Sequence, residues 1–311
     1  MTETPAELMA RAESTRAREI ETTPAGPIGR LYGASRVHRL LPAPIAVGLA
    51  RVRGALEWLL VRSSRAGAVE VASAFLGLPA DDPETRRLGR RYLEEKAMQS
   101  ELSWRPWAAR EMEVEGLRHL KEADARGKGV LLAGMHFGPM LSAHLALAAR
   151  GFKIYLSGGH PPEESVVHGY SGLWVKTQNL WMEQAGNRWV HKGNSFVVLR
   201  EVLLQGGICW LAWDTIGHDR QATYLGRKVR VQTGIARLHI ETGAPVLPVI
   251  ALRQGWRMRT VIGAPVEFPE GAGEGEINEV LGRVLGDLVS PDLAQLHYQS
   301  AVLFELAAEE G

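Results

Sequence analysis

The sequence predicts an α/β fold with a mostly parallel sheet flanked by helices and with an N-terminal helical region. The chain has 311 residues, 45% of them hydrophobic and 23% charged, so it is long enough to bury a large core. Short apolar runs bounded by glycine or turn residues alternate with helical patterns along its second half. This alternation is typical of parallel sheets, because the crossover between two parallel strands is usually a helix.

We expect a single domain that follows a mobile N-terminal extension. Residues 1–28 are polar and rich in Glu, Thr and Arg, and they lack the apolar centre of a signal peptide. Residues 84–126 carry helical patterns that are dense in charge. The expected parts of the domain, residues 29–311, are N-terminal helices over 29–126, a core over 127–265 and C-terminal helices over 276–311.

The elements of the core follow from local patterns. The expected strands are residues 129–134, 152–156, 208–213, 245–252 and 257–262. The expected helices are residues 139–150, 195–205, 233–242 and, after a linker at 269–275, residues 277–309 with a break near Pro291. Pro139 suits the first turn of its helix, and Gly206 and Gly207 end the next one. Thr233 is expected to cap the third helix.

The charge balance and the cysteine count exclude several classes of protein. Lys and Arg total 36 and Asp and Glu total 35, so the net charge is +1 and nucleic-acid binding is not expected. The single cysteine excludes a disulfide framework and any multi-cysteine zinc or iron–sulfur site. It also fits a reducing compartment, so we expect a cytoplasmic protein.

Residues 36–65 allow a peripheral contact with the inner face of the cell membrane. Apolar residues alternate there with arginines, a pattern typical of a helix that lies in a membrane interface. The alternative is an amphipathic helix that packs on the domain and has solvated arginines. The apolar stretch 40–50 is too short to span a bilayer, which needs ~20 residues. Trp58 is the tryptophan that best fits a membrane boundary.

Two polar residues follow separate predicted strands, where open α/β sheets bind their ligands. His136 comes two residues after the 129–134 run, and Asp214 directly follows the 208–213 run. The His-Phe-Gly-Pro sequence predicts a tight strand-to-helix turn that exposes the ring of His136 and holds it in place. Because imidazole titrates near neutral pH, His136 suits a general base. The alternative is that His136 only caps the turn.

Four nearby residues are expected to be buried or to border a pocket. His144 is expected inside the helix–sheet layer, and Cys209 is expected to be a buried, inert thiol in mid-strand. Trp210 and Trp213 flank the end of the strand that leads to Asp214, where we expect an apolar substrate pocket.

Four ordered blocks of sequence carry a family resemblance. They are VEGLRHLKEADARGKG followed by VLLAGMHFGPM from residue 114, LLQGGICWLAWD at 203–214, YLGRKVRVQTGIARL at 224–238 and ETGAPVLPVIALR at 241–253. Over roughly residues 36–265, the chain resembles the bacterial lipid A late acyltransferases. These belong to the lysophospholipid acyltransferase superfamily, together with the phosphatidylinositol mannoside acyltransferases.

The resemblance implies a glycerol-phosphate acyltransferase-like fold and an acyl-transfer reaction. Such enzymes move a fatty acyl group from acyl-CoA or acyl carrier protein to a hydroxyl of a lipid or glycolipid, and they need no metal and no further cofactor. Here the acceptor group could be a hydroxyl or an amine of a lipid, glycolipid or carrier-bound molecule. An alternative is an acyltransferase of specialised metabolism that acts on a non-lipid acceptor.

The family's H-x-x-x-x-D/E motif implies that His136 is the general base, but Leu141 stands where the motif has its carboxylate. That carboxylate holds the imidazole in the right tautomer. Three alternatives remain open. Asp214 or another acidic residue from a neighbouring strand orients His136. His136 works unaided on a more nucleophilic acceptor, such as an amine or a thiol. Or the chain is a catalytically inactive protein that binds a lipid or an acyl carrier.

Several cationic and hydroxyl side chains are candidates for substrate binding. Arg227 and Arg230 precede the helix that begins near Thr233, and helix N-termini with nearby cations favour the phosphate of a carrier or lipid. Arg253 corresponds to an arginine that ends a strand in the family, and Arg220, in a loop after Asp214, completes the candidate set. The alternative for Arg227 is a solvated basic face.

Overall fold

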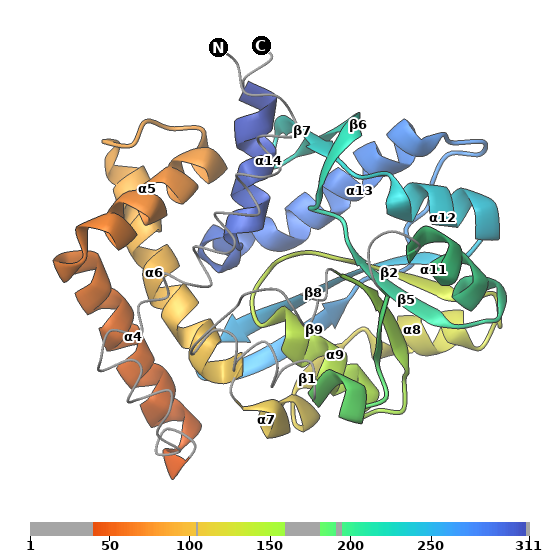
Figure 1. Cartoon of the computed structure of the whole chain (residues 1–311), viewed down its shortest axis with the longest axis horizontal. Coiled ribbons are helices and arrows are strands. Elements are labelled where there is room, and N and C mark those ends of the chain that lie inside the picture. Colours follow the sequence, from red (N-terminus) through yellow and green to blue (C-terminus); the bar gives the residue numbers. More distant parts are fainter. Residues whose placement is uncertain (1–39, 104, 159–180, 191–194, 309–311) are drawn as a thin grey trace, which may run out of the picture.

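The computed structural model describes residues 40–103, 105–158, 181–190 and 195–308, and it confirms the α/β fold with a mostly parallel sheet (Figure 1). The expected extension at 1–28 lies outside the described residues. The strands of the main sheet are β1 (Glu113–Glu115), β2 (Val130–Gly134), β3 (Ile154–Ser157), β4 (Arg188–Val190), β5 (Ile208–Ala212), β8 (Val246–Gln254) and β9 (Arg257–Ile262). Their spatial order is β1-β9-β8-β2-β5-β3-β4, and only the β8–β9 pair is antiparallel.

Helices cover both faces of this sheet and bury its central strand. They are α8 (Leu117–Asp124), α9 (Met140–Ala148), α11 (Ser195–Leu204), α12 (Gly234–Thr242), α13 (Glu274–Val289), the 3-10 helix η1 (Ser290–Gln295) and α14 (Tyr298–Ala308). Every residue of β2 is buried. Leu131 and Ala133 pack into the cluster that includes side chains of α11 to α14, whereas Val130 and Leu132 pack into the cluster that includes α8 and α9. This two-sided burial explains why β2 is apolar throughout instead of alternating.

The expected strands and helices of the core are found within about three residues, with one correction around Arg220. The predicted loop there is the first strand of an antiparallel ribbon, β6 (Ile216–Tyr224) and β7 (Arg227–Val231). Leu225 and Gly226 join the two strands with positive φ angles of 49° and 76°, as a tight hairpin turn requires. The charged residues of this ribbon concealed it from a search for apolar runs. β1 and β4 were also missed, because they are only three residues long.

The N-terminal region consists of α4 (Ala43–Leu60), α5 (Arg62–Leu76), α6 (Pro83–Ser103) and the short α7 (Pro106–Arg110). In Figure 1, α4 lies at the outer edge of the molecule and α6 lies between it and the sheet. The buried residues of α4 are small, namely Ala46, Val47, Ala50 and Gly54. A Cβ atom on Gly54 would come within 2.7 Å of the carbonyl oxygen of Leu93, so glycine permits the close approach of α4 to α6.

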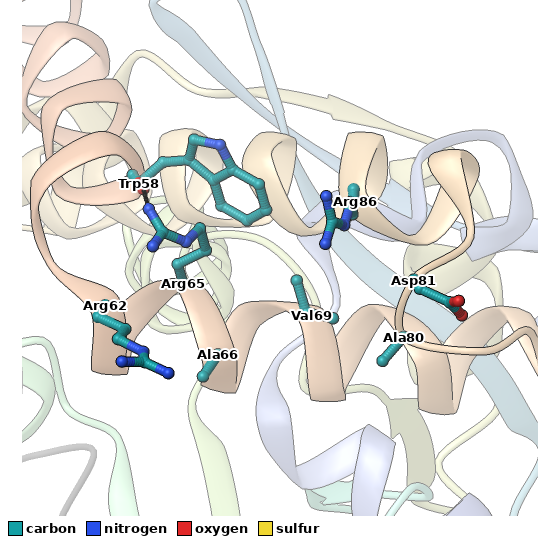
Figure 2. Close-up of a pocket in the computed structure, with 8 residues that line it drawn as sticks. All are labelled: Trp58, Arg62, Arg65, Ala66, Val69, Ala80, Asp81 and Arg86. Carbon is teal, nitrogen blue, oxygen red and sulfur yellow. Dashed lines mark hydrogen bonds between the residues drawn. The ribbon is translucent and has the colours of Figure 1, made fainter.

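Trp58, the tryptophan expected to suit a membrane boundary, is half-buried. Its side chain is partly buried against the core, and it lines a pocket beside the junction of α4 and α5 (Figure 2). The helical pattern predicted within residues 36–65 is also interrupted, since Val61 is in an extended conformation between α4 and α5.

Two glycines of α4 allow a matched test of the α4–α6 contact. We expect Gly54→Ala to destabilise the fold by ~1–3 kcal/mol, because the new methyl group overlaps the backbone of α6. Gly48 has no atom within 4 Å of an added Cβ, so Gly48→Ala should stabilise the helix by ~0.5–1 kcal/mol. Urea unfolding measures both free energies. Two changes of the same sign would contradict the packing described here.

Candidate active site

His136 and Asp214 meet at the carboxyl ends of two neighbouring parallel strands. Gly134 of β2 pairs in register with Ala212 of β5, so the residues two positions further along each strand also lie side by side. The His136 Nδ1 atom is 2.9 Å from Asp214 Oδ1. The backbone N–H of His136 donates to both carboxylate oxygens of Asp214, at 3.0 Å each. The carboxylate therefore holds both the ring of His136 and the turn that carries it.

Asp214 is a fully buried carboxylate with several hydrogen-bond donors. The Ser300 hydroxyl on α14 donates to Asp214 Oδ2. Burial alone would raise the pKa of Asp214, but the charge of His136 and the hydrogen bonds from His136 and Ser300 outweigh it, so the pKa lies below its ordinary value. At neutral pH Asp214 is therefore ionised and can only accept hydrogen bonds. In the neutral imidazole, only the tautomer with its proton on Nδ1 can donate to this carboxylate, and in that tautomer Nε2 is the nitrogen that can accept a proton.

The turn that carries His136 is fixed by a segment near the C-terminus. The backbone N–H of Gly138 donates to the Gln295 carbonyl and that of His297 donates to the His136 carbonyl, both at 2.9 Å. Phe137 forms an isolated antiparallel bridge with Leu296 between these two bonds. Gly138 has a φ of 54°, and a Cβ atom there would overlap the carbonyl oxygen of Ala251, so the turn requires glycine. With a side-chain exposure of 18%, His136 remains accessible.

A comparison with family models decides the class of protein. Residues 105–299, more than half of the chain, match the model of the bacterial lipid A biosynthesis acyltransferases. The chain belongs to this family. Comparison with curated proteins gives no match. The matched residues include His136 and Asp214. They begin and end later than residues 36–265, over which the resemblance was expected. The match therefore excludes α4 to α6 and stops one residue before Ser300.

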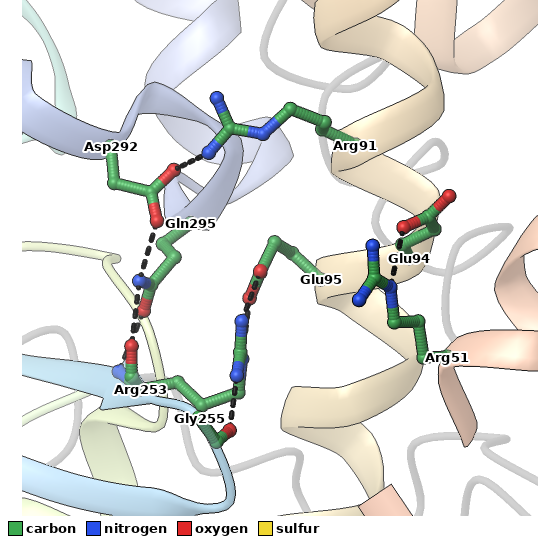
Figure 3. A network of polar contacts seen from close by, with 8 residues as sticks. All are labelled: Arg51, Arg91, Glu94, Glu95, Arg253, Gly255, Asp292 and Gln295. Carbon is green, nitrogen blue, oxygen red and sulfur yellow. Dashed lines mark hydrogen bonds and ion pairs between the residues drawn. The ribbon is translucent and has the colours of Figure 1, made fainter. Parts of the chain in front are cut away.

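In this family member, the side chain of Arg253 points toward α6 (Figure 3). Its Nε atom donates to Glu95 Oε2 at 2.7 Å, and a second guanidinium nitrogen donates to Glu95 Oε1. The backbone of Arg253 is joined to the His136 turn by Gln295, whose side chain accepts from the Arg253 N–H at 2.7 Å and donates to the Arg253 carbonyl at 3.0 Å. The structure thus connects Arg253 to the site through its main chain, with its charge paired to Glu95.

The other predicted substrate-binding residues lie on the ribbon and at the start of α12. Arg227 donates to the Ala74 carbonyl of α5 and lies over the ring of Phe304 on α14, so it does not form the solvated face given as its alternative. Arg230 pairs with Gln221 in the ribbon register. Thr233 is buried and precedes α12, but its hydroxyl makes no capping hydrogen bond, contrary to expectation. The side chain of Arg220 lies outside the described residues.

Two residues expected to be buried are confirmed as such. Cys209 is fully buried, and burial raises its pKa to about 12, so the thiol stays protonated. His144 is 1% exposed and lies edge-on to Trp210, with ring centroids 4.0 Å apart. Burial lowers the pKa of His144 to about 3, so its ring is neutral at physiological pH.

Trp210 and Trp213 both fill packed layers. Trp210 packs over Gly134, where an added Cβ atom would overlap the indole, and it belongs to the cluster that includes α8 and α9. Trp213 is 1% exposed and donates from Nε1 to Asn278 Oδ1 at 3.2 Å. These tryptophans hold the two faces of the sheet near the site instead of lining an open pocket there.

Sequence reasoning missed three residues that support the site, namely Ser300, Gln295 and Glu95. None belongs to a recognisable motif, and each reaches the site from a distant part of the chain. A weak signal existed for Glu95, because a buried arginine at the end of a strand needs a carboxylate partner. No comparable signal pointed to Ser300 or Gln295.

The buried ring of His144 should make folding stability depend on pH. Its folded pKa of about 3 lies below the ordinary value, so the unfolded chain takes up a proton as the pH falls below about 6.5 and the folded chain does not. Stability is therefore lost as pH falls, by ~2 kcal/mol for this group between about pH 7 and about pH 5. Urea unfolding at both pH values measures the loss of unfolding free energy in the wild type and in His144→Phe. We expect the loss in His144→Phe to be smaller by this amount.

The partly exposed His119 provides the control for this prediction. His119→Phe makes the same exchange of residue type at a position that is not fully buried, so comparing the two variants separates the effect of burying His144 from that of replacing a histidine. Equal pH dependence in wild type and His144→Phe would contradict a neutral, buried His144.

Proposed function

We propose that the chain transfers a fatty acyl group from an acyl thioester, acyl-CoA or acyl carrier protein, to a hydroxyl or amine of a lipid, glycolipid or carrier-bound acceptor. In this proposal His136 is the general base and Asp214 replaces the motif carboxylate. The observation that carries it is the 2.9 Å contact between His136 Nδ1 and Asp214 Oδ1. The contact favours the first of the three alternatives left open by Leu141.

The proposed reaction uses the free Nε2 atom of His136. Nε2 accepts the proton of the acceptor hydroxyl or amine as its oxygen or nitrogen attacks the thioester carbonyl. A carbon–oxygen or carbon–nitrogen bond forms, and the tetrahedral intermediate then collapses with cleavage of the carbon–sulfur bond. The imidazolium returns its proton to the departing thiolate. Asp214 stabilises the imidazolium between these two steps and does not itself take up the proton.

Ser300 and the C-terminal segment act as positioning residues in this proposal. The Ser300 hydroxyl fixes one oxygen of Asp214 while the other oxygen faces the imidazole. The segment of Gln295 to His297 fixes the backbone on either side of Phe137. Together these contacts restrict both the carboxylate and the ring, which supports catalysis by reducing the reorganisation needed at the moment of proton transfer.

The lipid acceptor also bears on where the protein works. Within residues 40–308, excluding the gaps in the description, no helix combines the length and apolar character needed to cross a bilayer. We propose a cytoplasmic protein that contacts the inner face of the cell membrane peripherally, through residues 36–65. Because Asp214 can supply the missing carboxylate, Leu141 no longer favours an inactive binding protein.

Replacing His136 or Asp214 should abolish most of the acyl transfer. We expect His136→Ala and Asp214→Asn each to lower kcat by ~10³–10⁴, with little change in KM, since the orienting carboxylate of a serine protease triad contributes about 10⁴. Ser300→Ala should lower kcat by a smaller factor, ~10, because Asp214 keeps its other donors. The assay follows thioester cleavage of acyl-CoA and of acyl carrier protein, with and without a lysophospholipid or a glycolipid acceptor.

His119→Ala is the matched control for that assay. His119 lies on α8, which leads into the amino end of β2, at the edge of the sheet opposite His136. Its activity should equal that of the wild type. Full acyl transfer by His136→Ala would overturn the proposal.

Restoring the motif carboxylate should bring no gain. In Leu141→Glu, the Nδ1 atom of His136 is already bonded to Asp214, so a second carboxylate has no proton to accept there. We expect kcat to stay equal or to fall in Leu141→Glu. The double variant Asp214→Asn with Leu141→Glu regains part of the lost rate only if the new carboxylate on α9 reaches His136. A clear rise of kcat in the single variant would show that Asp214 does not fill the role.

A further inference from the structure

The ribbon β6–β7 packs on α14, the helix that carries Ser300. In Figure 1, α14 stands between α5 and this ribbon. Tyr224 and Arg227 are register partners across the tight turn of the ribbon, so their side chains leave adjacent positions on one face. Both side chains contact Phe304 on α14. The ring of Tyr224 is stacked on that of Phe304 with centroids 5.6 Å apart, and the guanidinium carbon of Arg227 lies 4.3 Å from the Phe304 centroid.

Phe304 and Ser300 lie on the same side of α14, because they are four residues apart along the helix. Both residues are buried, and the Ser300 hydroxyl donates to Asp214 Oδ2. The contacts that fix the ring of Phe304 therefore also fix the helical turn from which Ser300 reaches Asp214.

A closed series of contacts joins the two ends of the hydrogen bond between Ser300 and Asp214. Trp213, the residue before Asp214, packs on Tyr224 with ring centroids 5.5 Å apart. Tyr224 packs on Phe304, and one turn of α14 then leads back to Ser300. All three rings are buried. Because close-packed side chains transmit a displacement, the position of Ser300 against Asp214 depends on these three rings.

Arg227 fastens Phe304 to the end of α5. Its guanidinium donates to the carbonyl of Ala74 in the last turn of that helix. It also lies against Gly77, which ends α5, since a Cβ atom there would be 3.4 Å from a guanidinium nitrogen. The C-terminal end of a helix favours a cation, because its last carbonyls carry partial negative charge. The half-buried charge of Arg227 is thus stabilised within the protein by a helix end and an aromatic ring.

We infer that Arg227 is a positioning residue for acyl transfer, which holds α14 so that Ser300 keeps Asp214 in place. This inference rests on the proposed function, because it concerns the same carboxylate. It differs from the role considered from the sequence, in which Arg227 binds the phosphate of a carrier or lipid. A guanidinium that binds phosphate presents its paired N–H groups to the ligand, whereas that of Arg227 donates to α5 and lies over Phe304.

The first test compares the steady-state kinetics of Arg227→Gln with those of the wild type, with acyl-CoA as the donor. We expect kcat to fall about fivefold and KM for acyl-CoA to stay unchanged, because a positioning residue acts on the reacting groups and not on substrate binding. Removal of a phosphate ligand would instead raise KM and leave kcat nearly unchanged. Arg227→Lys, which keeps the charge but lacks the planar guanidinium, should lower kcat in the same direction and serves if Arg227→Gln does not fold.

A double-mutant cycle tests whether Arg227 acts through Ser300. With losses of about fivefold for Arg227→Gln and about tenfold for Ser300→Ala, independent effects would multiply to about fiftyfold in the double variant. If Arg227 acts by holding Ser300, little is left to lose once the hydroxyl is gone, so we expect the double variant to stay about tenfold below the wild type. A general weakening of the fold would not produce this non-additivity.

Lys228→Gln is the matched control. Lys228 follows Arg227 on β7 and therefore points to the other face of the ribbon, where its exposed side chain pairs with Glu279. The variant removes one positive charge from the ribbon and should keep the kcat and KM of the wild type. Hydrogen exchange supplies a measurement that needs no activity. The amides of α14 should exchange several times faster in Arg227→Gln, and at the wild-type rate in Lys228→Gln.

Three results would overturn the inference. An unchanged kcat together with a raised KM in Arg227→Gln would make Arg227 a substrate ligand. Losses that multiply in the double variant would show that Arg227 does not act through Ser300. Unchanged exchange of α14 in Arg227→Gln would show that Arg227 does not hold the helix. A wild type that cleaves no thioester would instead refute the proposed function, while the exchange measurement would still decide whether Arg227 holds α14.

Discussion

The buried negative charge of Asp214 is the constraint on which the site depends. A carboxylate removed from water is strongly unfavourable unless donors surround it, and here the donors are the main chain and ring of His136 and the hydroxyl of Ser300. These groups come from the ends of β2 and β5 and from α14. The need to give one buried carboxylate its hydrogen bonds therefore joins three distant segments. Asp214 is 78 residues from His136 and 86 residues from Ser300 in the sequence.

A second set of contacts extends this constraint to the N-terminal helices. Gln295 accepts from and donates to the main chain of Arg253, and Arg253 forms paired hydrogen bonds with Glu95 of α6. Asp292, beside Gln295, pairs with Arg91 one turn earlier on α6. The C-terminal segment that holds the His136 turn is thus attached to α6 on one side and to β8 on the other. Removing one member of a partly buried network leaves its partners without hydrogen bonds and destabilises the whole network. The stability of the N-terminal helices is therefore coupled to that of the site.

The elements that could be predicted from the sequence are those whose burial dictates their composition. The apolar runs of β2 and β5 follow from helices on both faces of a parallel sheet, and the position of His136 and Asp214 follows from the shared edge where such strands end. The family resemblance was also confirmed, although over residues 105–299. The ribbon β6–β7 was not found, because its charged strands pair with each other outside the main sheet. Ser300 and Gln295 depend on how the C-terminal segment folds back, which no local pattern encodes.

The location of the carboxylate changes what holds the imidazole in place. In the H-x-x-x-x-D/E motif, both groups belong to one turn and the helix after it, whereas here Leu141 occupies that helical position and the carboxylate comes from another strand. The distance between the two groups then depends on the register of β2 against β5. A slip of one residue would reverse the faces of every side chain along a strand and would carry Asp214 away from His136. The orientation of the catalytic ring in the proposed mechanism is thus set by the register of two buried strands at the centre of the sheet and not by a single helical turn.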